Sequence, residues 1–481
     1  MRAKKNEKRS LSPSVLENQW VIADKNEKPH FAKCLAWLET MTARRHLDYL
    51  QIILGCFYSF FLVIQIARAE EFTTFGTIPH PAGAKEGFPR VYEFQDGSTF
   101  RLRGRIDTDA LWSIQDARNI STFGDLGSVV GLRRARVGGH GYLGTDRRYI
   151  AEIDLASGTV VPRDIFIGSR KHNGQPEMRL GHYREPFSLE GGTSANFYAF
   201  MERSPVNNLD PARSWGLSLF NDQLNDTTTF ATGLFHDGVG QANFEGGDGA
   251  AVGLTSRLTA SPILEGDGEQ VLHLGLVFSE RLPERGVVVI NQISGSPLLE
   301  FTDSTTSPFV PTIRIPASYQ QLFNAQIARV WGPLWTQAEW YGTLIPQHSG
   351  ALLFFHGYYA SAGYFLTGEY RKYQKDDGVF GPVNVRHPWL AGSHSRGRSR
   401  GRGGWELVAR YAYLDYFDPN TPLNPKGAAS GIRLGQATIG LNWYLADRLR
   451  VLFNYNYALP NEPTAGASEA SVFGTRLNVH W

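Results

Sequence analysis

The sequence predicts an all-β fold, a transmembrane antiparallel β-barrel of about sixteen strands. Three observations lead to this prediction. The chain ends in an alternating segment that closes on an aromatic residue, an apolar run with a cleavage motif lies near its start, and alternating segments of about ten residues recur between turns over the rest of the chain.

The last segment, residues 473–481, alternates strictly between two kinds of side chain. Successive side chains of a β-strand point to opposite faces. One face therefore carries Phe473, Thr475, Leu477, Val479 and Trp481, and the other carries Arg476, Asn478 and His480. The first face suits lipid and the second water, and a terminal aromatic residue suits the girdle at a membrane boundary.

The apolar run 50–67 has the features of a secretory signal peptide. Basic residues precede it, and the small-residue motif Ala67-Arg68-Ala69 follows it. We expect cleavage after Ala69, and Met41 would be a more ordinary start than Met1. A membrane anchor is the alternative, because the run is just long enough to span a bilayer.

These features divide the chain into three parts. Residues 1–69 form an N-terminal extension plus signal peptide, residues 70–97 a short periplasmic segment, and residues 98–481 the barrel. No second apolar run of spanning length follows residue 69, which excludes a helical membrane protein.

The composition of the mature part differs from that of the whole chain. The leader holds 11 of the 48 basic and 6 of the 46 acidic residues, so residues 70–481 carry a net charge of −3 whereas the whole chain carries +2. Both cysteines, Cys34 and Cys56, lie in the leader, which excludes a disulfide or a cysteine metal site in the mature protein. Arginine supplies most of the positive charge, since only five lysines remain: Lys85, Lys171, Lys372, Lys375 and Lys426.

The charged residues of the alternating segments keep to one face. In residues 100–112 the charged face carries Arg101, Arg103, Arg105, Asp107 and Asp109. An arginine facing lipid at mid-depth would cost about 2–4 kcal/mol, so the charged face is expected to point into the lumen. Rings or ladders of arginine are typical of anion pores. The candidate residues of the anion pathway are Arg101, Arg103, Arg105, Arg134, Arg136, Arg410, Arg450 and Arg476. The alternative is that each is a wall charge paired with an Asp or Glu of a neighbouring strand, as in any porin.

Several blocks of the sequence resemble the phosphate-selective porin O and P family. They are residues 179–190, Thr193-Ser194, residues 200–204, 364–371, 404–411 and 440–444, and they are collinear over most of the mature chain. The resemblance implies a sixteen-stranded barrel in the outer membrane of a Gram-negative bacterium, usually a homotrimer, whose pore selects anions and in some members phosphate or polyphosphate. It also implies phosphate or other small anions and outer-membrane lipid as partners, and no cofactor, metal ion or nucleic acid.

The sequence departs from the family in two respects. The net charge of the mature part is slightly negative. The lumen lysines that form a tight phosphate site in the best-known members have no counterpart that can be aligned here. A general, weakly selective porin or a substrate-specific channel therefore remains an alternative.

The most basic stretch, residues 393–403, is expected to be a flexible periplasmic connection. Its arginines are Arg396, Arg398, Arg400 and Arg402. They could concentrate anions at the pore mouth, and the alternative is a disordered, solvated loop. Residues 397–401 also match the Gly-x-Ser-x-Gly nucleophile motif, but without the strand-to-helix turn that this motif requires. An outer-membrane hydrolase is a remote alternative, and no catalytic residue is assigned.

Overall fold

The computed structural model describes residues 91–481 except 159, 170–175, 226, 238–249, 291–308, 310–312, 391–400 and 423–430, and it leaves out the side chains of 221–225. The predicted leader and cleavage site lie outside the described residues. The domain boundaries assigned to them stay predictions.

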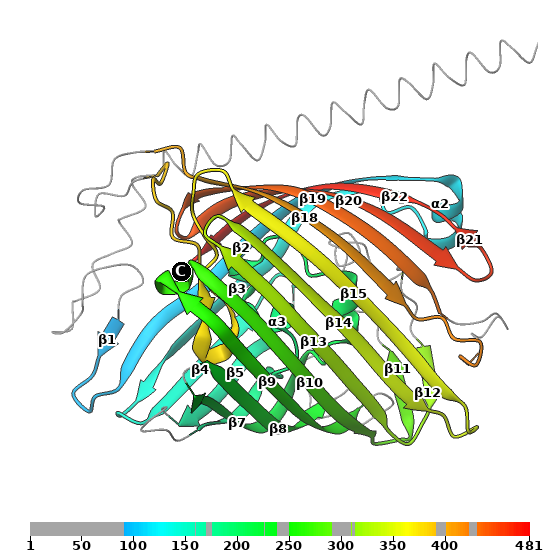
Figure 1. Ribbon diagram of the computed structural model, residues 1–481, viewed down its shortest axis with the longest axis horizontal. Helices are drawn as coiled ribbons and strands as arrows, with labels where there is room; N and C mark the ends of the chain where they lie inside the picture. Colours follow the sequence, from blue (N-terminus) through cyan, green and yellow to red (C-terminus); the bar gives the residue numbers. More distant parts are fainter. Residues whose placement is uncertain are drawn as a thin grey trace, which may run out of the picture. The chain divides into compact units, whose positions relative to one another are not determined.

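Sixteen of the described strands form one closed antiparallel barrel (Figure 1). Each strand pairs with the next along the chain, and the last pairs with the first. The strands are β2 (Thr99–Gln115), β3 (Ser128–Leu143), β4 (Arg147–Asp154), β5 (Val161–Ser169), β6 (Glu177–Arg184), β7 (Arg213–Asn225), β8 (Thr228–Asp237), β9 (Ala251–Glu265), β10 (Gln270–Pro283), β13 (Gln320–Trp331), β14 (Leu334–Pro346), β15 (Leu352–Phe365), β18 (Gly404–Asp415), β19 (Arg433–Ala446), β20 (Leu449–Glu462) and β22 (Ala470–His480). The predicted fold class and strand number are confirmed.

The C-terminal residue takes part in closing the barrel. Beyond the β2–β22 ladder, the backbone N–H of Trp481 donates to the carbonyl of Gly104 and the N–H of Gly104 donates back, both at 3.0 Å. The short strand β1 (Val91–Glu93) then pairs with the beginning of β2. Closure gives each of the sixteen described barrel strands a partner on both sides, as a bilayer requires.

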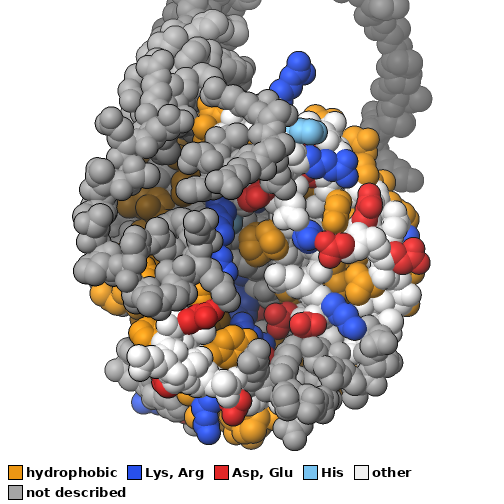
Figure 2. All heavy atoms as spheres, turned by 90° about the vertical axis from the view of Figure 1, so that its left-hand side faces the viewer, with side chains coloured by type: hydrophobic (Ala, Val, Ile, Leu, Met, Phe, Trp, Pro, Cys, Tyr) orange, Lys and Arg blue, Asp and Glu red, His pale blue; other side chains and the backbone are white. Residues whose placement is uncertain are grey.

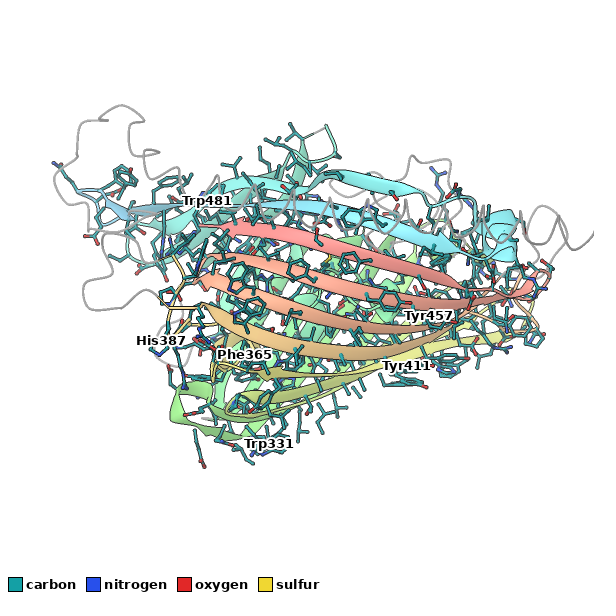
Figure 3. The ribbon with its side chains drawn as sticks, turned by 90° about the horizontal axis from the view of Figure 1, so that it is seen from above. Trp331, Phe365, His387, Tyr411, Tyr457 and Trp481 are labelled. Carbon is teal, nitrogen blue, oxygen red and sulfur yellow. The ribbon has the colours of Figure 1, made fainter. Side chains whose placement is uncertain are left out.

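The two faces of the wall differ as the alternation predicts. Outward apolar side chains are exposed, such as Leu276 at 66% and Ile439 at 60%, whereas inward polar ones such as Asp107 and Glu406 are fully buried. Figure 3 shows Trp331 and Trp481 near one end of the barrel and Tyr411 near the other. Aromatic residues at both boundaries form the girdles expected of a membrane barrel.

Two long connections fold into the barrel from opposite ends. The inward loop, residues 185–212 between β6 and β7, enters from the end opposite the C-terminus and contains α3 (Leu189–Gly192), η1 (Ala195–Phe197) and η2 (Pro205–Leu209). The lumen insert, residues 369–385 between β15 and β18, enters from the C-terminal end and contains β16 (Tyr373–Gln374), η4 (Lys375–Asp377) and β17 (Val379–Phe380). The backbone N–H of Phe380 donates to the Thr193 hydroxyl at 3.4 Å, so the two segments meet inside.

The remaining described elements lie in other connections: α2 (Ala117–Phe123), η3 (Gly266–Gly268), the hairpin β11 (Val287–Ile290) with β12 (Ile313–Pro316), and β21 (Gly466–Ala467). None of the described helices is both long and apolar enough to cross a membrane.

Candidate permeation pathway

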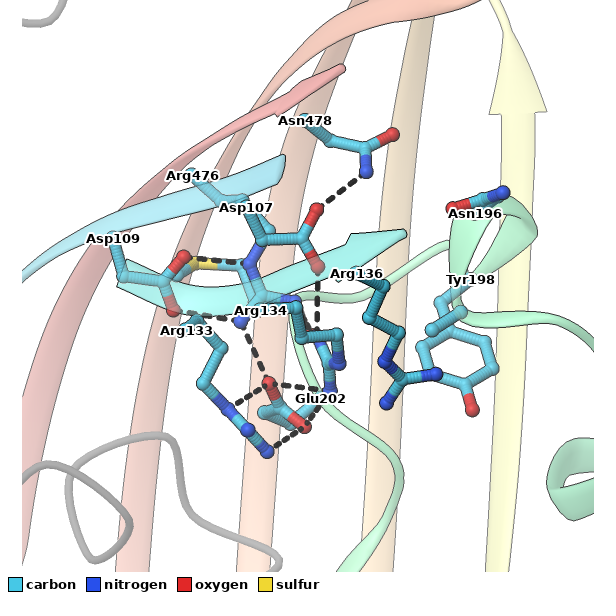
Figure 4. A network of polar contacts seen from close by, with 12 residues as sticks. Asp107, Asp109, Arg133, Arg134, Arg136, Asn196, Tyr198, Glu202, Arg476 and Asn478 are labelled. Carbon is cyan, nitrogen blue, oxygen red and sulfur yellow. Dashed lines mark hydrogen bonds and ion pairs between the residues drawn. The ribbon is translucent and has the colours of Figure 1, made fainter. Parts of the chain in front are cut away.

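The tip of the inward loop is held against the wall by a cluster of charges, here named the anchor network (Figure 4). Its members are Asp107, Asp109, Arg133, Arg134, Glu202 and Arg476. Glu202, on the loop, receives hydrogen bonds from Arg133 at 3.0 Å, Arg134 at 2.9 Å and Arg476 at 2.6 Å. Asp107 pairs with Arg134 at 3.0 Å, and Asp109 pairs with Arg476 at 2.6 Å. Three guanidinium groups therefore meet three carboxylates, and the network is close to neutral.

The protonation of Glu202 follows from these contacts. Burial alone raises the pKa of a carboxyl group, but the guanidinium groups of Arg133, Arg134 and Arg476 outweigh burial and hold the pKa of Glu202 well below its usual value of 4.5. The loop therefore presents a carboxylate to the wall at any neutral or mildly acidic pH.

Two further predicted arginines, on β18 and β20, also hold the loop. Arg410 pairs with Glu190 of the loop at 3.0 Å and donates to the carbonyl of Glu202 at 3.1 Å. Arg450 donates to the carbonyl of Tyr198 at 2.6 Å, with no carboxylate partner among the described residues. These two arginines position the loop inside the barrel.

The beginning of α3 is fixed by an acid on the wall. The carboxylate of Glu339 on β14 accepts the backbone N–H groups of Leu189 at 3.0 Å and Glu190 at 2.7 Å. These N–H groups have no partner within the helix itself, because the first turn of a helix leaves its donors free. The hydroxyl of Ser188 accepts the N–H of Gly191 at 2.8 Å, so the beginning of the helix is held both by its own N-cap and by Glu339 on the wall.

The part of the lumen wall nearer the C-terminus carries more positive than negative charge. We name it the basic wall, and on β2 to β5 and β7 its charged members include Arg101, Arg103, Arg105, Arg136, Arg163, Arg213, Glu152, Asp154 and Asp164. Glu152 is shared by Arg103 at 2.9 Å and Arg136 at 3.4 Å. Asp154 is shared by Arg136 at 2.8 Å and Arg163 at 3.3 Å. Asp164 pairs with Arg213 at 3.1 Å. Within the described residues neither Arg101 nor Arg105 forms an ion pair, so six guanidinium groups face three carboxylates.

Two polar groups beside this wall lack a partner among the described residues. Arg105 is only 3% exposed, and one of its terminal nitrogens makes no hydrogen bond. The hydroxyl of Tyr198, on the inward loop, likewise makes none, and it lies near enough to Arg184 and Arg213 to interact with their charges. A buried donor without a partner is costly unless water or a ligand supplies one.

The lumen insert is fixed to the opposite side of the ring. Arg257 on β9 donates to the backbone carbonyls of Asp377 at 2.9 Å and Gly378 at 2.7 Å. The hydroxyl of Tyr373 lies 2.6 Å from Nδ1 of His273 on β10. In the pairing order of the barrel, β9 and β10 lie half-way round from β2. The insert therefore fills the side of the lumen that faces the basic wall.

Figure 2 shows the C-terminal end of the barrel, where basic side chains line a hollow near the centre. Of the four arginines expected at a pore mouth, Arg396, Arg398 and Arg400 lie outside the described residues. Arg402 is exposed, and its carbonyl accepts the indole N–H groups of Trp405 at 3.2 Å and Trp443 at 3.0 Å. These tryptophans belong to the outward face, so Arg402 lies at the outer rim of the barrel.

Several residues that shape the pathway could not be identified from the sequence: Arg163, Tyr198, Glu190 and Glu202. In β5, Arg163 and Asp164 are adjacent, which breaks the alternation, and a register irregularity lies opposite them between Ala151 and Ile153. Glu190 and Glu202 had a weaker signal, because they lie within blocks recognised only by resemblance, and Tyr198 lies between two such blocks. Among the described residues no cluster of His, Cys, Asp and Glu could hold a metal ion.

A closed sixteen-stranded barrel with an apolar outer face and a charged lumen narrowed by its own loop defines a channel protein of the porin class. The family model for phosphate-selective porin O and P matches residues 100–480, and the chain belongs to this family. It is therefore an outer-membrane porin of a Gram-negative bacterium, a channel and not an enzyme.

Two relatives and one solved structure show how far the likeness extends. The chain is 28% identical over 375 residues to an uncharacterized protein of Caulobacter vibrioides, covering 76% of this chain and 70% of the relative. It is 25% identical over 405 residues to Porin O of Pseudomonas aeruginosa, covering 79% and 87%. The outer membrane channel DcaP of Acinetobacter baumannii superposes with a TM-score of 0.48 at 11% identity, covering 81% and 99%.

Proposed function

We propose that this porin conducts small anions by passive diffusion along the basic wall, between that wall and the inward loop. The observation that carries the proposal is that the arginines of the basic wall outnumber the carboxylates and have to share them. Six arginines face the three carboxylates of Glu152, Asp154 and Asp164, and two of the arginines, Arg101 and Arg105, have no ion-pair partner among the described residues.

The physical argument concerns the potential in a narrow pore. Guanidinium groups stay charged at any relevant pH. A cleft lined by one sign of charge, with walls of low dielectric constant, concentrates ions of the opposite sign. The excess charge of the basic wall therefore favours anions, whereas the neutral anchor network mainly holds the loop in place.

We propose inorganic phosphate as one of the permeating anions. An arginine fork matches the oxygen atoms of phosphate, and the family description supports this assignment. The chain has only five lysines after residue 69, which favours weak transient contacts with arginine over a tight lysine site. We also propose a homotrimer, as the family resemblance implies, and the mass of the detergent-purified assembly tests it directly.

The experiment is the reversal potential of the purified porin in a planar bilayer under a KCl gradient. We expect the sign of the reversal potential to show that chloride is more permeant than potassium. We also expect the chloride conductance to fall when phosphate is added. A reversal potential of the opposite sign, which shows potassium to be the more permeant ion, would refute the proposal. Equal permeabilities of chloride and potassium would favour a general, weakly selective porin.

A further inference from the structure

The connection that forms the lumen insert continues onto the outside of the barrel. After residue 385 it leaves the lumen, and residues 386–390 and 401–403 lie against the rim at the C-terminal end; we name them the rim strap. Gly401 donates to the carbonyl of Pro388 and Gly403 donates to that of His387, both at 2.9 Å. The backbone N–H of Trp389 donates to the carbonyl of Leu445 at 2.9 Å, which attaches the strap to the end of β19.

Three tryptophans form a platform at this rim. Trp405 and Trp443 are cross-strand partners on β18 and β19, with ring centroids 5.1 Å apart and an interplanar angle of 13°. The ring of Trp389 lies 5.5 Å from that of Trp443. Because both indole N–H groups of the stacked pair donate to the carbonyl of Arg402, the platform and the strap hold each other in place.

Exposed positive charge lies beside this platform. Arg386, His387 and Arg402 are exposed, and within the described residues no ion pair is formed by Arg386 or Arg402. Figure 3 shows His387 at the same end of the barrel as Trp481. The nearby acids have other partners: Glu369 is 1% exposed and accepts the N–H of Arg386 at 3.1 Å, and Asp447 accepts that of Val385 at 2.9 Å.

This end of the barrel meets the periplasmic leaflet of the outer membrane. Bacterial barrels place short turns on the periplasmic side, and the connections 144–146, 332–333 and 447–448 at the C-terminal end are short. Tryptophan is favoured at the headgroup level of a bilayer, and basic pockets beside it attract anionic headgroups.

We propose that the rim strap and the tryptophan platform form a seat for the phosphate headgroup of an anionic phospholipid. Arg386 and Arg402 contact the phosphate, while Trp405 and Trp443 pack along the glycerol and the first part of the acyl chains. This site lies outside the barrel and does not depend on the ion selectivity of the pore.

The test measures binding of phosphatidylglycerol to the full-length, detergent-purified porin by native mass spectrometry, with phosphatidylcholine as the comparison lipid. We expect the Arg386→Gln/Arg402→Gln variant to bind phosphatidylglycerol about 25-fold more weakly, since each arginine near an anionic surface strengthens binding about fivefold. Each single variant should show about a fivefold loss. The matched control is Arg147→Gln, an exposed arginine at the same end of the barrel, and it should leave binding unchanged.

Three outcomes would overturn the proposal. Equal binding of phosphatidylglycerol by the wild type and the double variant would show that the strap does not select the headgroup. Full displacement by 10 mM inorganic phosphate, on the order of the weak affinities expected of a free-anion site, would assign the arginines to free anions. A change in the mass of the assembly without loss of lipid would assign the strap to contacts between subunits.

Discussion

At the scale of single residues, the position of a carboxylate decides what an arginine does. Arg134 and Arg476 were predicted as lumen arginines together with Arg103 and Arg105, but they meet Glu202 and form part of a neutral network. The alternation of a strand shows which way a side chain points. It does not reveal a partner such as Glu202, which lies 274 residues from Arg476 along the chain.

Glu202→Gln should loosen the inward loop. The substitution leaves three buried guanidinium groups without their shared carboxylate, and removing one partner of a buried ion pair costs about 3–5 kcal/mol. We expect higher single-channel conductance and more open-channel noise, measured in planar bilayers. Glu265→Gln, at the exposed end of β9, is the control and should behave as the wild type. Identical records for both variants would show that Glu202 does not hold the loop.

The low pKa of Glu202 predicts how the loop responds to acid. A carboxylate with a depressed pKa stabilises the docked loop at all pH values above the pKa of the free group, and this contribution is lost only as pH falls through the depressed value. Single-channel conductance should therefore stay constant from pH 7 to pH 5, and loosening should begin only well below pH 4.5. A transition in loop noise between pH 7 and pH 5 would contradict this assignment.

At the scale of elements, the strands could be predicted and the two inward segments could not. A strand has a local period of two, so the charged face of 100–112 and the segment ending at Trp481 could be assigned from the sequence. The inward loop and the lumen insert have no such period. Their positions depend on contacts with distant strands, such as Arg257 with Gly378 and Glu339 with Leu189.

Phe380→Ala should release the lumen insert without opening the barrel. Phe380 is fully buried, with the guanidinium of Arg371 4.1 Å from its ring, and truncation of a buried phenylalanine costs about 3–5 kcal/mol. We expect a larger conductance together with unchanged heat-modifiable mobility on SDS gels. Phe94→Ala removes the same atoms from a 57% exposed position and is the matched control. A conductance equal to that of the wild type would mean that the insert does not narrow the passage.

At the scale of the whole molecule, closure of the ring makes the barrel stable in a membrane. Strand β22 pairs on one side with β20 and on the other with β2, so it joins the two ends of the sheet. Both the closing strand and the number of strands were predictable, because length, turn spacing and the terminal alternation constrain them together.

A chain that ends at residue 469 lacks β22 and should fail to form the barrel. Its removal leaves β2 and β20 as unpaired edges, which hydrocarbon does not tolerate. We expect no heat-modifiable band after refolding into detergent or lipid. A folded, heat-modifiable product would show that another strand can close the ring.

The central claim is that the excess arginines of the basic wall set the preference for anions. The most direct measurement is the reversal potential under a KCl gradient of the Arg101→Gln/Arg103→Gln/Arg105→Gln variant, compared with the wild type and with Arg433→Gln, an exposed arginine at the opposite end of the barrel. We predict that the triple variant shifts toward equal permeability of chloride and potassium, whereas the control keeps the wild-type value. A triple variant that folds and retains the wild-type reversal potential would contradict the account.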